Sequence, residues 1–136
     1  MTTLKIGELA SKGNVNLETI RYYEREGLLR PPQRTSSGHR AYAPPDVLRL
    51  RFIKRSQALG FRLTEIKELL ALKVAPDQPC MDVVRQIEAK AVEVKAKIAH
   101  LQAIERTLRK MKASCDGRRS MSECPILESL DSEHRS

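Results

Sequence analysis

The sequence contains no tryptophan, and its aromatic residues make up only 4% of the chain. A core with so few aromatic rings must be built mostly from aliphatic side chains, which is typical of small helical proteins. With 136 residues, 40% of them hydrophobic, the chain has room for one compact domain and an extended element. Two large domains are excluded.

Long apolar runs and catalytic motifs are also absent. Residues 1–15 lack the hydrophobic stretch of a signal peptide, and no later segment is long enough to cross a membrane. We therefore expect a cytoplasmic protein with no membrane partner. Its three cysteines cannot all pair, and cytoplasmic thiols stay reduced, so a disulfide framework is not expected. Neither an HExxH pair nor a phosphate-binding glycine loop occurs, so we predict that the protein is not an enzyme.

Positive charge is concentrated in the first half of the chain. The net charge is +8, and residues 1–75 carry 14 basic and 7 acidic side chains, against 11 and 10 in residues 76–136. Clustered cationic charge attracts polyphosphate surfaces, which makes nucleic acid a candidate partner. Charge alone is equally compatible with a basic, soluble surface.

Residues 4–27 have the pattern of two short helices joined by a turn. Asn16 is a suitable N-cap for the second helix, and Gly27 is a suitable stop. Arg21 and Tyr22 project from this helix, which makes it a candidate recognition helix. The residues expected on its buried side are Ile20 and Tyr23.

Residues 28–45 are rich in proline, serine and glycine but also carry positive charge. The sequence Ser-Ser-Gly at 36–38 suits a hairpin tip, and residues 39–42 suit a short returning strand. We interpret this segment as a wing. Its basic and histidine residues are Arg30, Arg34, His39 and Arg40.

Two further helices are expected before residue 75. Asp46 is the predicted cap of the first, which should end at Gly60, and Thr64 is the predicted cap of the second. The apolar positions assigned to the first are Leu48, Phe52, Ile53 and Leu59. Those assigned to the second are Ile66, Leu69 and Leu70.

A long helix is predicted from Cys80 to about Lys112, a stretch with neither glycine nor proline. Apolar residues recur every seven positions, which is the pattern of a coiled coil and favours dimerisation. A helix packed on its own domain is the alternative. The repeating positions are Ile87, Val94, Leu101 and Leu108, with Val84, Ala91 and Ile98 alternating between them.

Cys80 and Cys115 are 35 residues apart and fall at opposite ends of this heptad pattern. On one helix their thiols would lie roughly 50 Å apart, so a single straight helix cannot bring them together. Antiparallel pairing of two chains would place Cys80 beside Cys115 of the partner subunit. The loop after Cys115 could then bring Cys124 into the same site.

Three thiolates favour soft metal ions, and the loop offers no evident fourth ligand. Mercury(II) or lead(II) therefore suits the site best, although cadmium(II) or zinc(II) could recruit Asp116, Glu123 or water. His100 is interpreted as a surface residue of the helix rather than a ligand. Three unrelated thiols, or a cytoplasmic protein that only buffers metal, are the alternatives.

Several motifs of the chain occur in a fixed order: IGELA, VNLETIRYYEREGLL, GHRAY and DVLRLRFIKRSQALGF, followed by the three cysteines and CPILESL. Together they resemble the MerR family of transcription regulators. The resemblance extends from residue 4 to about Leu130. The cysteine pattern is most similar to that of the mercury-responsive members.

This resemblance implies a mostly α protein: a winged helix-turn-helix domain (1–75), an antiparallel coiled-coil dimerisation helix (80–113) and a metal-binding loop and tail (114–136). It implies a homodimer on pseudo-palindromic double-stranded operator DNA, acting on RNA polymerase at the promoter. The implied metal ligands are Cys80, Cys115 and Cys124. The implied DNA contacts are Arg21, Tyr22, Arg40, Tyr42, Arg55 and Lys5.

The implied function is a mercury(II)-responsive regulator that represses without metal and activates a resistance promoter by distorting operator DNA when metal is bound. A lead-, cadmium- or zinc-responsive regulator of the same family is the first alternative. A cytoplasmic thiolate metal-buffering protein is the alternative from another class. Sequence-specific DNA binding separates the two classes.

Overall fold

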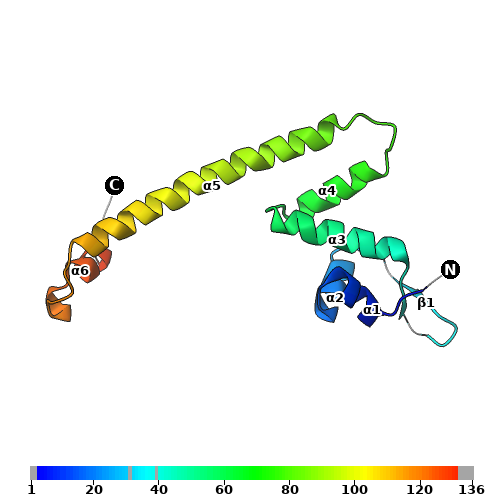
Figure 1. The fold of residues 1–136 in the computed structure, drawn as a ribbon, viewed down its shortest axis with the longest axis horizontal. Coiled ribbons are helices and arrows are strands. Elements are labelled where there is room, and N and C mark those ends of the chain that lie inside the picture. The colour runs from blue at the N-terminus through cyan, green and yellow to red at the C-terminus, as the bar shows by residue number, and fades with distance from the viewer. Residues whose placement is uncertain (1–2, 31, 39, 132–136) are drawn as a thin grey trace. The chain divides into compact units, whose positions relative to one another are not determined.

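The computed structural model describes residues 3–30, 32–38 and 40–131, and it is mostly helical, as predicted (Figure 1). Its elements in chain order are α1 (Ile6–Gly13), α2 (Leu17–Arg25), β1 (Gln33–Arg34), β2 (Arg40–Ala41), α3 (Pro44–Ala58), α4 (Leu63–Lys73), α5 (Met81–Ala113), the 3-10 turn η1 (Met121–Glu123) and α6 (Pro125–Asp131). The chain divides into two compact units, Met1–Lys90 and Ala91–Ser136. The domain boundaries expected from the sequence stay predictions.

The core of the first unit is mostly aliphatic and lies among four helices. α1 packs against both α2 and α3, and α3 packs against α4 (Figure 1). Burying each large aliphatic side chain contributes about 1.5–3 kcal/mol, so a handful of them dominates the stability of so small a unit. The side chains with the least exposure are Leu9, Ile20, Leu28, Leu50, Ile53 and Ile66.

Local sequence signals at the second helix are confirmed. The side-chain oxygen of Asn16 accepts the backbone N–H of Thr19 at 2.8 Å, which satisfies a donor at the start of α2. Gly27 adopts φ +78°, a left-handed conformation that favours glycine and turns the chain after the helix. Ile20 and Tyr23 are buried, as predicted.

The predicted caps of the next two helices are wrong. α3 begins at Pro44, and Asp46 lies in its first turn, where its carboxylate accepts the backbone N–H of Ala43 at 2.8 Å. α4 begins at Leu63, so Thr64 is inside it. Both helices instead use an acidic residue in the first turn, which reaches back to the residue before the helix and suits the positive helix end.

The buried face of α3 also differs from the prediction. Ile53 is buried as predicted, but Leu48 is 64% exposed and Leu59 is 54% exposed, while Val47 and Leu50 line the core instead. Two apolar stripes lie side by side on this helix, and the sequence pattern does not show which of them the neighbouring helices cover. On α4 the predicted face is confirmed, with all three of its apolar residues buried.

β1 and β2 form the predicted wing, a two-stranded antiparallel hairpin in which Gln33 lies opposite Ala41. Gly38 has φ +85° at its tip. The base of the hairpin is tied to the segment before α1, because Leu4 and Tyr42 exchange backbone hydrogen bonds of 2.7 and 2.8 Å. His39 lies outside the described residues.

α5 has 33 residues and begins within the first unit. Its Val83 packs against the core, and Lys90 is buried with its ammonium 2.8 Å from the carboxylate of Glu65 on α4. The apolar residues of the predicted seam are exposed in this chain: Val84, Ile87, Ala91, Val94, Ile98, Leu101 and Leu108. His100 is also exposed, which agrees with its interpretation as a surface residue.

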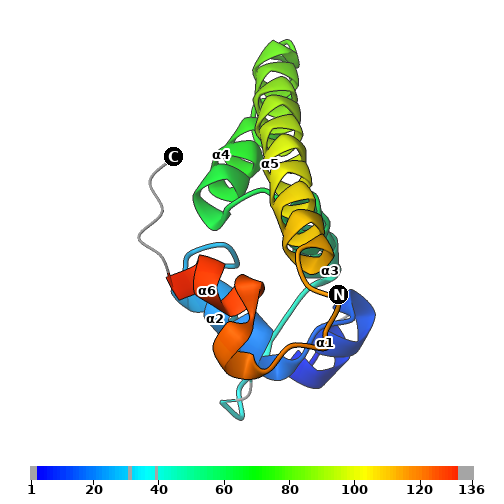
Figure 2. The same ribbon diagram turned by 90° about the vertical axis from the view of Figure 1, so that its left-hand side faces the viewer.

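Figure 2 shows the turn that leads from the end of α5 through η1 into α6. Cys124, Pro125 and Ile126 are half-buried at this turn. His134 lies outside the described residues. No helix in residues 3–30, 32–38 or 40–131 is both long and apolar enough to cross a membrane.

Candidate nucleic-acid interface and cysteine positions

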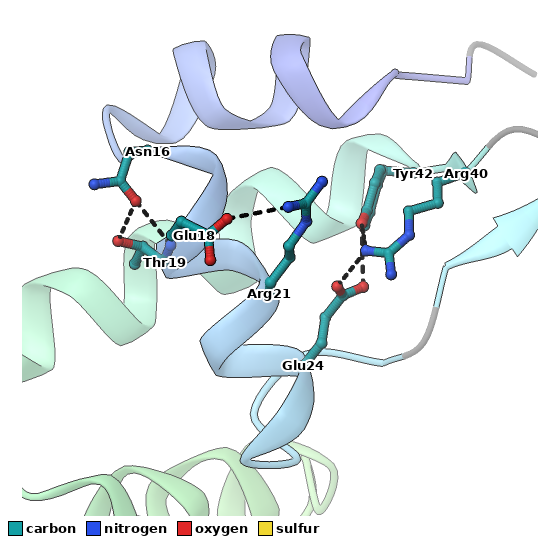
Figure 3. Close-up of polar contacts among 7 residues, drawn as sticks. All are labelled: Asn16, Glu18, Thr19, Arg21, Glu24, Arg40 and Tyr42. Carbon is teal, nitrogen blue, oxygen red and sulfur yellow. Dashed lines mark hydrogen bonds and ion pairs between the residues drawn. The ribbon is translucent and has the colours of Figure 1, made fainter.

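α2 presents the two side chains that the sequence predicts for a recognition helix. Arg21 and Tyr22 are exposed, whereas Ile20 and Tyr23 on the opposite side are buried. The guanidinium of Arg21 lies 3.0 Å from the carboxylate of Glu18, one helical turn earlier (Figure 3). A surface ion pair of this kind is weak, so Arg21 can exchange this partner for a phosphate or a base edge at little cost.

A cationic groove lies between the wing and the start of α1. Its lining residues are Lys5, Ile6, Arg34, Gly38 and Arg40. The guanidinium of Arg34 donates to the carbonyl of Gly38 at 2.9 Å and so fixes the hairpin tip. The structure thus brings together two sequence-predicted DNA contacts, Lys5 and Arg40, and adds Arg34 beside them.

The wing is joined to α2 by a three-residue polar network (Figure 3). Arg40 donates to Oε1 of Glu24 at 2.8 Å, and the hydroxyl of Tyr42 donates to Oε2 of Glu24 at 3.1 Å. The guanidinium also lies 3.4 Å from the Tyr42 hydroxyl. Tyr42 is only 3% exposed, and burial raises the pKa of its hydroxyl. The hydrogen bond with Tyr42 is the main reason that the pKa of Arg40 is raised.

Most cations of α3 bind to the rest of the domain. Three of them donate to backbone carbonyls: Arg49 to Leu28 at 2.6 Å, Arg51 to Lys12 at 3.2 Å, and Lys54 to Asn14. These contacts satisfy carbonyl groups around the helix-turn-helix. Arg55 differs, because its exposed guanidinium makes no hydrogen bond or ion pair within the described part of the chain.

The three cysteines are free thiols placed around α5 and the turn after it. Cys80 is exposed and directly precedes α5, while Cys115 and Cys124 are half-buried and flank the turn. The backbone N–H of Gly117 donates to the sulfur of Cys115 at 3.4 Å and orients that side chain. Nowhere in the described ranges do three His, Cys, Asp or Glu side chains converge into a metal site.

Residues 4–73 match the family described as MerR HTH family regulatory protein, and residues 47–111 match a second description, MerR, DNA binding. The chain belongs to the MerR family. It is similar to a mercuric resistance operon regulatory protein of Bacillus cereus, with 46% identity over 93% of this chain and 96% of the relative.

Two solved MerR-family structures are also similar. PbrR691 of Ralstonia metallidurans CH34, in complex with lead(II), has a TM-score of 0.83 and 39% identity over 93% of this chain and 98% of its own. The dual-function regulator MerR of Bacillus megaterium MB1, in complex with mercury(II), has a TM-score of 0.69 and 43% identity with the same coverage. The family and the winged helix-turn-helix fold expected from the sequence are confirmed.

MerR-family proteins are DNA-binding regulators rather than enzymes, which confirms that expectation. In this member, Arg21, Tyr22 and Arg55 are exposed and free to approach DNA, whereas Tyr42 packs in the core of the domain. Its hydroxyl donates to Glu24, so this side chain joins the wing to α2. The individual DNA contacts stay predictions.

Sequence reasoning missed Glu24, and it placed Arg34 in the wing without naming it as a DNA contact. Glu24 was overlooked because a carboxylate on a DNA-facing helix has no obvious use against phosphates. A signal for it was present: the sequence predicts an extended segment at residues 39–42, and residues two apart in extended backbone, such as Arg40 and Tyr42, share one face. A shared acceptor on the facing helix could therefore be sought, and Glu24 is the residue that fills this role.

Proposed function

We propose that this chain is a metal-responsive regulator that acts as a homodimer on operator DNA, with mercury(II) as its inducer. The observation that carries the proposal is the set of three free thiols around α5, in a chain whose first unit is a winged helix-turn-helix. Relatives in complex with mercury(II) and with lead(II) support a thiophilic inducer. The relative from Bacillus cereus, a mercuric resistance regulator, favours mercury(II).

Dimerisation through α5 is supported by its exposed apolar stripe. Ile87 is 48% exposed, Val94 38%, Leu101 63% and Leu108 59%. Side chains of this kind at heptad spacing lose water contact when a second helix packs against them, which stabilises an association by about 25 cal/mol per Å² of apolar surface. We propose that the partner helix is α5 of a second copy of the chain, in antiparallel orientation.

Antiparallel pairing would complete the metal site. Cys80 of one protomer would approach Cys115 of the partner subunit, and the turn through Gly117 would bring Cys124 to the same place. Mercury(II) would form strong bonds with the soft thiolates and would so join the two protomers at each end of the coiled coil. Lead(II), cadmium(II) and zinc(II) are the alternative inducers.

The regulatory step would be a change in DNA shape. The metal-free dimer would hold the promoter inactive, and the metal-bound dimer would bend and untwist the DNA between the two promoter elements so that RNA polymerase engages both. Deformation of DNA can carry such a signal without a new contact to polymerase. The exposed Arg21 and Tyr22 on α2 and the cationic wing groove would grip the DNA in both states.

Transcription with purified components tests the whole proposal. RNA polymerase, the full-length protein and a promoter with a long spacer would be combined with mercury(II), lead(II), cadmium(II), zinc(II) or copper(I). We expect activation at the lowest concentration with mercury(II). Activation by another metal at the lowest concentration would identify that metal as the inducer and leave the rest of the proposal intact. Metal binding without any sequence-specific DNA binding would identify a metal buffer instead.

Mixed dimers test the shared site separately. Chains carrying Cys80→Ser are combined with chains carrying Cys115→Ser, and the three-thiolate charge-transfer spectrum is measured during mercury(II) titration. Each homodimer should lack an intact three-thiolate site, whereas each mixed dimer should regain one. If the mixture shows no more of the three-thiolate spectrum than the separate homodimers, the thiols do not come from two protomers.

A further inference from the structure

Glu24 is an unusual residue for a predicted recognition helix, because it carries negative charge beside the surface expected to face DNA. It lies on α2 next to the buried Tyr23 and one helical turn after the exposed Arg21, and its side chain is only 11% exposed. A carboxylate in this position repels phosphates and lowers affinity for any DNA sequence. Its presence beside Arg21 and Tyr22 therefore calls for a compensating role.

Both carboxylate oxygens of Glu24 are engaged by the wing (Figure 3). Oε1 accepts from Arg40 at 2.8 Å and Oε2 accepts from Tyr42 at 3.1 Å. The backbone of Tyr42 is already fixed by its hydrogen bonds with Leu4. Arg40 lies two residues farther toward the hairpin tip, so Glu24 is the contact that holds this outer part of the wing to α2.

Among the described residues of the wing, the backbone pairing of Tyr42 with Leu4 is another contact that fixes it to the domain, and it lies at the base of the hairpin. Its strands contain two residues each, and Gln33 and Arg34 of β1 are both exposed. A two-stranded hairpin is only marginally stable by itself, so its orientation depends on contacts with neighbouring elements. The Arg40–Glu24 pair is charge-assisted and partly shielded from water, which makes it stronger than an ordinary surface ion pair.

We propose that Glu24 is a specificity-determining positioning residue that acts through Arg40. It fixes the wing at one distance from α2, so that both elements meet the DNA as a rigid unit. On DNA without the operator sequence, it also neutralises the charge of Arg40. The proposal rests on the DNA-binding function proposed above. It predicts that removing the negative charge of Glu24 lowers specificity, although it makes the protein more cationic.

The test compares Glu24→Gln with a matched control, Glu26→Gln. Glu26 is exposed at the end of α2, and its carboxylate makes no hydrogen bond or ion pair within the described residues. Both substitutions change the charge by one unit, but only the first breaks the network. The probes are a duplex selected from a random pool by the wild-type full-length protein and a scrambled duplex of equal length and composition.

For Glu24→Gln we expect affinity for the selected duplex to fall about tenfold, which is the scale of one charge-assisted hydrogen bond. Affinity for the scrambled duplex should rise. The plot of log affinity against log salt concentration should become steeper by about 0.9 for each Arg40 side chain that is released from Glu24 and binds a phosphate. Glu26→Gln should raise both affinities without changing their ratio. In an Arg40→Ala background, Glu24→Gln should no longer steepen the salt dependence.

The proposal is overturned if Glu24→Gln behaves as Glu26→Gln does and raises both affinities together. If the variant does not fold, Tyr42→Phe replaces it, because this change keeps the ring and the charge pair but removes one donor to Glu24. We then expect a loss of specificity of about threefold with an unchanged salt dependence, and an unchanged specificity would overturn the proposal. Failure of the wild-type protein to select any sequence would instead refute the proposed function.

Discussion

The buried ion pair between α4 and α5 gives the sharpest prediction about stability. Lys90 is 6% exposed, its ammonium lies 2.8 Å from Oε1 of Glu65, and it also lies 5.3 Å from the centre of the Phe61 ring. The same carboxylate oxygen accepts the backbone N–H of Arg62 at 2.7 Å. Replacing Lys90 therefore removes a contact that holds α5 to α4, while Glu65 keeps its hydrogen bond from the backbone N–H of Arg62.

The magnitude follows from these contacts. Lys90→Met keeps most of the apolar stem and removes the ammonium, with its charge-assisted hydrogen bond and its contact with the ring of Phe61. We expect a loss of about 1–2 kcal/mol, because a charged hydrogen bond contributes about 1.5–3 kcal/mol and relief of the buried ammonium offsets part of it. Lys90→Ala also removes three buried methylenes at about 0.8 kcal/mol each, so its loss should reach about 3–4 kcal/mol.

The contribution of Glu65 depends on pH with a defined sign. The backbone N–H of Arg62, followed by the ammonium of Lys90, lowers the pKa of Glu65 from 4.5 to about 2. A carboxylate with a depressed folded-state pKa stabilises the fold above its ordinary pKa, and this contribution is lost as the pH falls through the folded value. The stability difference between wild type and Glu65→Gln should therefore be full at pH 7 and shrink between about pH 4.5 and pH 2.

Urea unfolding followed by circular dichroism measures these differences, at one fixed protein concentration because association contributes to stability. Lys95→Ala, at an exposed lysine of the same helix, is the control and should change stability by no more than about 0.5 kcal/mol. A Lys90→Ala variant as stable as this control would refute the buried placement of Lys90. A wild-type to Glu65→Gln difference that stays constant from pH 7 to pH 3 would refute the assigned pKa.

Three further variants test other parts of the fold. Asn16→Ala removes the cap of α2 and should lower the free energy of unfolding by about 1 kcal/mol in urea titrations. Gly13→Ala would place a methyl group 2.2 Å from Cδ2 of Leu50, so thermal unfolding should show a loss of about 1–3 kcal/mol, whereas Gly7→Ala meets open space and should be neutral or stabilising. Leu101→Lys places a charge in the exposed stripe of α5, so sedimentation should show monomers; an unchanged dimer mass would contradict the proposed interface.

Features with a local chemical cause could be predicted from the sequence. The Asn16 cap, the turn at Gly27 and the hairpin tip at Gly38 each depend on one residue and its immediate neighbours. The long helix from Met81 to Ala113 was also predictable, because neither proline nor glycine interrupts it. In each case the conformational preference of the local sequence and the final fold agree.

Features that depend on distant partners could not be predicted. The contact between Glu24 and Arg40 joins residues 16 apart, and that between Glu65 and Lys90 joins residues 25 apart. On α3, Leu48 and Leu50 are equally apolar in the sequence, and only the packing of α1 and α4 decides that Leu50 is buried. Composition and spacing do not contain this information, because it depends on how the helices are placed in space.

The number of thiolates around the metal distinguishes the possible arrangements of two α5 helices. Antiparallel pairing would join Cys80 of one protomer to the loop thiols of the other and create equivalent sites of three thiolates. Parallel pairing would instead place the two copies of Cys80 at one end and all the loop thiols at the other, which creates sites of two and four thiolates. Each coordination number has its own charge-transfer spectrum, so mercury(II) titration of the full-length protein decides between them. We expect the three-thiolate spectrum in wild type and its loss in both Cys80→Ser and Cys124→Ser, because each substitution leaves only two thiolates in every site. Survival of the three-thiolate spectrum in Cys80→Ser would exclude the antiparallel arrangement.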